Sequence, residues 1–102
     1  MPKKILELTF GYKIPVEELA KAFLELAPTW AAINGLDWKI WIHNGEEKKA
    51  GGRYLFDSEE SLKDYLDGEL YAGLFKHPAL ENIRTEVYDV LPEHSKITRG
   101  PI

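Results

Sequence analysis

The chain has 102 residues, no cysteine, a formal net charge of −4, and 44% hydrophobic and 12% aromatic residues. This length allows one domain with a single modest core, so we expect residues 1–102 to form one domain. The absence of cysteine excludes disulfides, thiol catalysis and thiolate metal sites, and it suits the reducing cytoplasm, where we expect the protein to act. Without a long basic run or an apolar run of roughly 20 residues, neither nucleic acid nor a membrane is an expected partner.

The first predicted strand spans residues 4–10, where side chains alternate between two faces. Leu6, Leu8 and Phe10 share one face, and we expect this face to pack on the core. Ile5 makes the opposite face partly apolar as well.

A helix is predicted after Pro15, whose fixed φ suits a first helical turn. Pro28 lies inside the helical pattern and is expected to kink or end the helix nearby. Asn34-Gly35 is a stop signal. The apolar stripe of this helix, read at helical spacing, consists of Val16, Leu19, Ala20, Phe23, Ala27, Trp30 and Ala31.

Residues 36–43 and 50–56 are predicted to form two strands joined by the charged loop that begins at Asn44-Gly45. Gly51-Gly52 lies inside the second of these strands. It indicates a bulge, or a place where another backbone or a ligand comes close.

The two faces of the strand over residues 36–43 each carry a tryptophan. One face carries Trp38, Ile40 and Ile42, which we interpret as core beneath the helices. The other face carries Lys39, Trp41 and His43.

Asp57, followed three residues later by Glu60, is typical of a capping box at the start of a second helix. Gly68 weakens that helix, and Pro78 ends the segment. The last strand is predicted over residues 82–91.

The resulting order, β-α-β-β-α-β, predicts an α+β ferredoxin-like fold, with a four-stranded antiparallel sheet and both helices on one face. The second sheet face is then partly apolar and has to be buried. A homodimer packed sheet to sheet would bury it. Residues 92–102 have no core pattern, and this tail either folds on its own chain or extends over the partner.

Several sequence blocks carry a family resemblance. They are Gly35-Leu36-x-Trp38-Lys39-x-Trp41, Ala50-Gly51-Gly52-x-Tyr54-Leu55-Phe56, Tyr65-Leu66, Tyr88-Asp89-Val90 and Ser95. With these blocks the chain resembles the YdhR-type putative monooxygenase family, which has the dimeric α/β-barrel fold. The segment from Asp67 to Ala79 departs from the family pattern, and Lys49 stands where an acidic residue is expected.

The resemblance implies oxygenation of small aromatic, phenol- or quinol-like compounds, with no metal or flavin cofactor. In such chemistry the phenol or quinol is deprotonated, and the electron-rich anion then reduces O₂ in a cavity closed to water. Relatives of this fold also include cyclases, isomerases and haem-handling proteins. The alternatives are therefore a cyclase or isomerase, and a non-catalytic binder of an aromatic or lipophilic small molecule.

Three side chains are candidate catalytic residues. His43 could act as the base, because imidazole titrates near neutrality. Lys39 could stabilise a phenolate, and Tyr54 could donate a hydrogen bond. The candidate substrate-binding residues are Trp41, Trp38, Arg53, Phe56 and His77.

Each candidate also has a purely structural interpretation. Trp41 suits a dimer interface, His43 a solvated loop end, and Lys39 a side chain whose stem lies along aromatic rings. Arg53 could pair with an acidic residue across the dimer, and His77 could simply end a helix.

No metal site is expected. His43, His77 and His94 lie far apart in the sequence, without the spacings typical of metal ligands. Haem binding through His77 is an alternative that the sequence leaves open.

Overall fold

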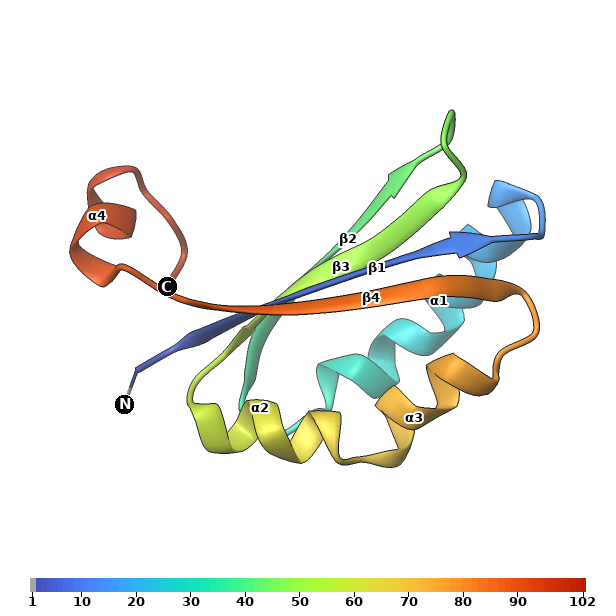
Figure 1. Ribbon diagram of the computed structural model, residues 1–102. Coiled ribbons are helices and arrows are strands. Elements are labelled where there is room, and N and C mark those ends of the chain that lie inside the picture. Colours follow the sequence, from blue (N-terminus) through green and yellow to red (C-terminus); the bar gives the residue numbers. More distant parts are fainter. Residues whose placement is uncertain (1) are drawn as a thin grey trace.

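One antiparallel sheet, in the strand order β2-β3-β1-β4, organises the protein. The computed structural model describes residues 2–102 (Figure 1). The elements run in the order β1 (Lys4–Tyr12), α1 (Val16–Ala31), β2 (Leu36–Asn44), β3 (Lys49–Phe56), α2 (Glu59–Leu66), α3 (Glu69–Lys76), β4 (Leu80–Asp89) and α4 (Pro92–Ile97).

The helices α1, α2 and α3 cover one face of the sheet, while α4 lies beyond its end (Figure 1). This arrangement confirms the predicted ferredoxin-like fold. The strand predicted over residues 82–91 begins and ends two residues earlier, as β4. No helix within residues 2–102 is both long and apolar enough to span a membrane.

The core lies between the sheet and the three helices. Leu6, Leu8 and Phe10 are buried there, as the alternation in β1 predicts. The neighbouring strand β3 adds Tyr54 and Phe56 from the same sheet face, and the helices add Leu19, Trp30, Leu62 and Tyr65. Burial of this apolar surface is the main force that holds the helices on the sheet.

The predicted faces of β2 are exchanged in the structure. Trp41 packs against Phe23 of α1, with ring centroids 5.1 Å apart, so Trp41 faces the helices. Trp38 and Ile40 therefore lie on the opposite face, and the prediction that Trp38, Ile40 and Ile42 form core beneath the helices is wrong.

A bulge at the start of β2 explains this error. Leu36 pairs with Phe56 on the helix side, but the register then shifts, and Trp38 pairs with Leu55 on the far side. One extra residue, Asp37, thus moves every later side chain of the strand to the other face.

The second predicted helix is two helices, α2 and α3. Gly68 has an extended backbone, with φ −91° and ψ 173°, and forms the N-cap of α3. Glycine disfavours the helix interior, so the chain turns at this position. The predicted capping box at Asp57 is also wrong, because the N-cap is Ser58, whose Oγ accepts a hydrogen bond from the N–H of Ser61 at 3.1 Å.

Pro28 lies inside α1, which ends three residues later, at Ala31. Gly35 follows with φ 84°, the left-handed conformation that a stop signal requires. In β3, a Cβ at Gly51 would lie 1.9 Å from the carbonyl oxygen of Leu8. Gly51 therefore marks a close approach of backbones, one of the two interpretations offered by the sequence, while the pairing of β3 continues through it without a bulge.

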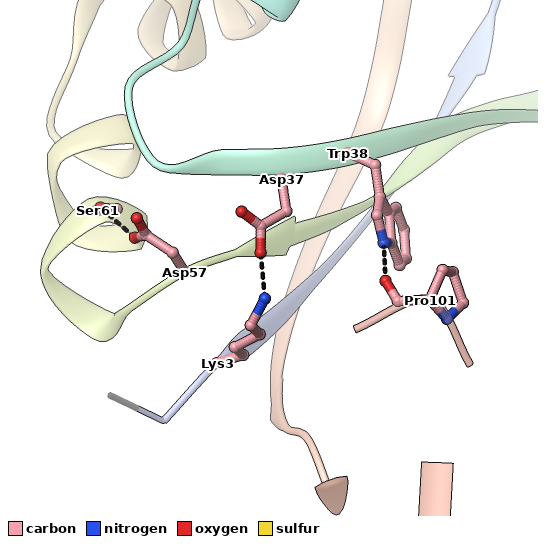
Figure 2. A network of polar contacts seen from close by, with 6 residues as sticks. All are labelled: Lys3, Asp37, Trp38, Asp57, Ser61 and Pro101. Carbon is pink, nitrogen blue, oxygen red and sulfur yellow. Dashed lines mark hydrogen bonds and ion pairs between the residues drawn. The ribbon is translucent and has the colours of Figure 1, made fainter. Parts of the chain in front are cut away.

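The C-terminal tail folds back on its own sheet. The indole Nε1 of Trp38 donates to the carbonyl oxygen of Pro101 at 2.6 Å (Figure 2). Near this contact the chain start is held by an ion pair between Lys3 and Asp37, also 2.6 Å long. On the same sheet face Leu55 is fully buried, with 0% exposure.

Candidate functional site

The ammonium group of Lys39 lies among three aromatic rings beneath the helices. Its Nζ is 3.3 Å from the ring centroid of Trp41, 4.6 Å from that of Tyr54 and 4.7 Å from that of Trp30. Aromatic faces are electron-rich and attract a cation at these distances. We call Lys39 and these three rings the Lys39 cage.

Strand pairing places the cage residues. Lys39 lies opposite Tyr54 across the β2–β3 ladder, and Trp41 lies opposite Gly52. Trp30 reaches down from the last turns of α1 and is buried. The missing side chain of Gly52 leaves room for the stem of Lys39, since a Cβ at Gly52 would be 2.7 Å from Lys39 Cε.

Burial changes the ionisation of Lys39. Within residues 2–102 no carboxylate lies within ion-pair distance of its Nζ. Desolvation disfavours the charged form and lowers the pKa of Lys39 to about 7. Near neutral pH the side chain can therefore take up a proton as a free amine, or hold one as an ammonium.

A chain of hydrogen bonds lies beside the cage. Trp30 Nε1 donates to the hydroxyl of Tyr65 at 3.4 Å, and the hydroxyls of Tyr65 and Tyr54 are 3.2 Å apart. Burial raises the pKa of Tyr54 and of Tyr65 above the ordinary value, so both remain neutral hydroxyls. When Tyr65 donates to Tyr54, the hydrogen of Tyr54 is free for another acceptor.

Two hollows adjoin the cage. A cavity of about 20 Å³ lies against Lys39, Tyr54 and Trp41, and it is roughly large enough for one water molecule. A groove of about 320 Å³ lies between α1 and β2. Phe23 and Trp41 line both hollows.

The structure brings four of the predicted site residues together. Lys39, Trp41 and Tyr54 belong to the cage, and Phe56 stacks on Tyr54 with centroids 6.0 Å apart and planes within 7°. His43 stands outside the cage, exposed, at the side of the α1–β2 groove.

Three predicted site residues lie elsewhere. Arg53 is on the far face of the sheet, where Nη2 is 3.4 Å from Oε1 of Glu7. Trp38 is on the same far face and holds the tail. His77 is the exposed C-cap of α3, and its Nδ1 accepts a hydrogen bond from the N–H of Ala79 at 3.1 Å.

Sequence reasoning missed Trp30 and Gly52 as site residues. Trp30 was assigned to the core stripe of its helix, and nothing local distinguishes a ring that packs from a ring that holds a cation. Gly52 carried a usable signal, because a glycine inside a strand indicates a close approach. No three His, Asp or Glu side chains within residues 2–102 come together as a group that could hold a metal ion.

Comparison with known proteins gives a family and a fold. Residues 5–101 match the family described as “Putative mono-oxygenase ydhR”. No curated protein matches the chain.

Among solved structures, similar folds occur in proteins of low sequence identity. A protein of unknown function from Nitrosomonas europaea has a TM-score of 0.74 and 22% identity, over 89% of this chain and 91% of that one. SnoaB, a cofactor-independent oxygenase from Streptomyces nogalater, has a TM-score of 0.70 and 10% identity, over 87% and 93%. A dimeric protein of unknown function with a ferredoxin-like fold from Bacteroides fragilis has a TM-score of 0.65 and 18% identity, over 86% and 96%.

Proposed function

The chain belongs to the ydhR putative mono-oxygenase family, and we propose that it is a cofactor-independent monooxygenase acting on small phenol- or quinol-like aromatic compounds. The observation that carries this proposal is the Lys39 cage, in which burial lowers the pKa of an amine to about 7 among aromatic rings. A general base is most effective when its pKa lies near the working pH.

In the first step the neutral amine of Lys39 takes the proton of the substrate hydroxyl. The resulting ammonium then stabilises the phenolate that forms beside it, in surroundings where water is largely excluded. Tyr54 donates a hydrogen bond to the same oxygen, with Tyr65 and Trp30 holding the Tyr54 hydroxyl in place.

In the second step the electron-rich phenolate reduces O₂. One oxygen atom forms a bond to a ring carbon, which loses its hydrogen, and the phenol oxygen becomes a carbonyl. The other oxygen atom leaves as water, so that phenol and O₂ give a quinone and water. The substrate supplies all four electrons, and Lys39 returns the proton it took.

His43 is an alternative base, but it lies outside the cage. The rings of Trp41 and Trp30, with centroids 6.0 Å apart, lie beside Lys39 and supply aromatic walls for a flat ligand. The position of Lys39 between Trp41 and Tyr54 therefore favours Lys39 as the group that meets the substrate oxygen.

Oxygen uptake by the metal-free protein with a panel of phenols, quinols and catechols tests this function, with autoxidation subtracted. We expect uptake that rises with pH through about 7, as Lys39 loses its proton, and that falls about 10²–10³-fold in Lys39→Met. Uptake equal in wild type and Lys39→Met would contradict the role of Lys39. Turnover that persists under nitrogen would indicate a cyclase or isomerase, and tight binding without turnover would indicate a binding protein.

We also infer that the protein is a homodimer packed through the far face of the sheet. Ile40 and Tyr88 lie on that face with exposures of 52% and 47%. Nη1 of Arg53 is buried there without a hydrogen-bond partner among residues 2–102. A second copy would cover the apolar side chains and could offer the carboxylate of its Glu7 to that guanidinium.

A further inference from the structure

The groove between α1 and β2 is a second compartment next to the Lys39 cage. Its volume of about 320 Å³ reaches the range of small-ligand sites. Apolar side chains of α1 form one wall, including Ala20, Leu24 and Ala27, and Leu24 is 76% exposed. The other wall belongs to β2, which is the end strand of the sheet.

A single aromatic layer separates this groove from the cage. Phe23 and Trp41 line both the groove and the small cavity, and their ring centroids are 5.1 Å apart. The ring of Trp41 is also the one closest to Lys39 Nζ, at 3.3 Å. A shift of the Phe23 or Trp41 ring would join the two hollows into one elongated site.

The two ends of this elongated site carry different polar groups. Lys39 and His43 lie on the same face of β2, on either side of Trp41, and four residues of strand span about 13 Å. Apart from His43, every residue that lines the groove is apolar. His43 is exposed at the groove side, where its Nε2 lies 3.4 Å from the position that a Cβ on Gly45 would occupy.

We propose that the α1–β2 groove holds the body of the substrate, and that the substrate is a fused-ring hydroxyaromatic compound with a hydrogen-bond acceptor at the end opposite its hydroxyl. The hydroxyl passes between Phe23 and Trp41 to reach Lys39, and the acceptor group binds the imidazole of His43. This inference rests on the proposed function for the identity of the reacting hydroxyl.

The length of the site supports a compound larger than one ring. The cavity beside Lys39 holds roughly one water molecule, so the ring system has to lie mainly in the groove. Phe23, Trp41 and the apolar side chains of α1 suit the faces and edges of fused rings. His43 then determines specificity, because it is the polar group at the far end.

Binding measured by calorimetry on the metal-free full chain tests the proposal, with 6-hydroxy-2-naphthoate, 2-naphthol and phenol as probes. We expect 6-hydroxy-2-naphthoate to bind about 10-fold more tightly than 2-naphthol, through one charge-assisted hydrogen bond. His43→Ala should remove this difference, whereas His94→Ala, a change in the distant helix α4, should retain it. Phe23→Trp, which fills the passage, should weaken both naphthalene compounds more than phenol. Circular dichroism confirms that each variant is folded.

Failure of this inference differs from failure of the proposed function. If His43→Ala and His94→Ala affect naphthoate binding equally, the assignment of His43 is wrong even when oxygen uptake persists. Binding of both naphthalene compounds that Phe23→Trp leaves unchanged would overturn the groove as the substrate compartment. The expected binding pattern without any oxygen uptake would support the groove and contradict the oxygenase. A further outcome would be that the protein binds no naphthoate and self-associates, and that Leu24→Asp abolishes this self-association. The groove would then be the binding site of a second copy of the chain.

Discussion

The side chain of Lys39 lies directly over the position that a Cβ on Gly52 would occupy. A Cβ on Gly52 would come within 2.7 Å of Lys39 Cε and 3.2 Å of Tyr54 Cε1. The glycine in β3 thus allows the lysine stem of β2 to fold inward, so that its amine lies among aromatic rings and not at the free edge of the sheet.

Gly52→Ala should displace Lys39 from its cage. We expect a stability loss of about 1–3 kcal/mol, because the added methyl overfills a packed site, together with a large loss of oxygen uptake. Urea unfolding and oxygen uptake measure the two effects. Gly73→Ala is the matched control, since Gly73 lies in α3 and an added Cβ would have no atom within 4 Å apart from its neighbours in the chain and the backbone of its own helix. That change should stabilise the protein by up to about 1 kcal/mol and leave activity unchanged, and equal effects at both glycines would contradict this account.

Lys39 should make stability depend on pH. Its pKa is about 7 in the folded protein and 10.5 in the unfolded chain, so between these values the unfolded chain binds more protons. The free energy of unfolding therefore rises with pH from about 7 to 10.5 through this group, and below 7 the destabilisation by the buried cation is fully present. Lys39→Met should be more stable than the wild type at pH 6, and the difference should shrink as the pH rises. Urea unfolding of both proteins at pH 6, 8 and 9.5 checks this, and a constant difference would show that Lys39 is not desolvated.

Ser58, and not Asp57, should cap α2. Ser58→Ala removes the acceptor for the N–H of Ser61 and should cost about 1 kcal/mol. Glu60→Ala should change stability by less than about 0.5 kcal/mol, because Glu60 is exposed and outside any special contact. Thermal unfolding of the two variants separates these expectations. A larger loss of stability in Glu60→Ala than in Ser58→Ala would instead support the capping box formed by Asp57 and Glu60.

The dimer should depend on the far face of the sheet. Light scattering should give a mass near twice 11.7 kDa, and Ile40→Asp should shift it to the monomer, since a carboxylate would be buried in an apolar contact. Phe75→Asp is the control, because Phe75 is exposed to a similar extent, 55% against 52%, but lies on α3 at the helix side. A monomeric wild type at micromolar concentration would refute the sheet-to-sheet dimer.

The hydrogen bond from Trp38 to Pro101 should hold the C-terminal tail. Trp38→Phe keeps an aromatic ring at this position but removes the indole donor, so trypsin should cleave after Lys96 and Arg99 faster than in the wild type. Mass spectrometry follows the products, and cleavage after Lys48 in the hairpin loop serves as the internal reference. Unchanged tail cleavage would mean that other contacts hold the tail.

Local periodicity predicted most of the fold. The alternation of Leu6, Leu8 and Phe10 identified the buried face of β1, and helical spacing placed Leu19 and Trp30 in the core. These predictions succeed because the direction of the side chains repeats every few residues in a strand or a helix. Residues that are close in the sequence therefore show which face is buried. Gly68 showed where the second helix is weak, although its division into α2 and α3 became clear only in the structure.

The candidate site was only partly predictable. Lys39, Trp41 and Tyr54 were named from the sequence, and they meet in the structure. Which face of β2 Lys39 and Trp41 occupy was not predictable, because one bulged residue, Asp37, reverses the alternation after Leu36.

The amino-acid sequence by itself determined the order of the strands and helices, the core face of β1 and the family. Tertiary structure decided that Trp30 from α1 and Tyr54 from β3 enclose the Lys39 amine, and that Arg53 and Trp38 lie on the other side of the sheet. The physical reason is that the pKa of Lys39 depends on desolvation by residues distant in the chain. Such an environment exists only after the elements have packed together.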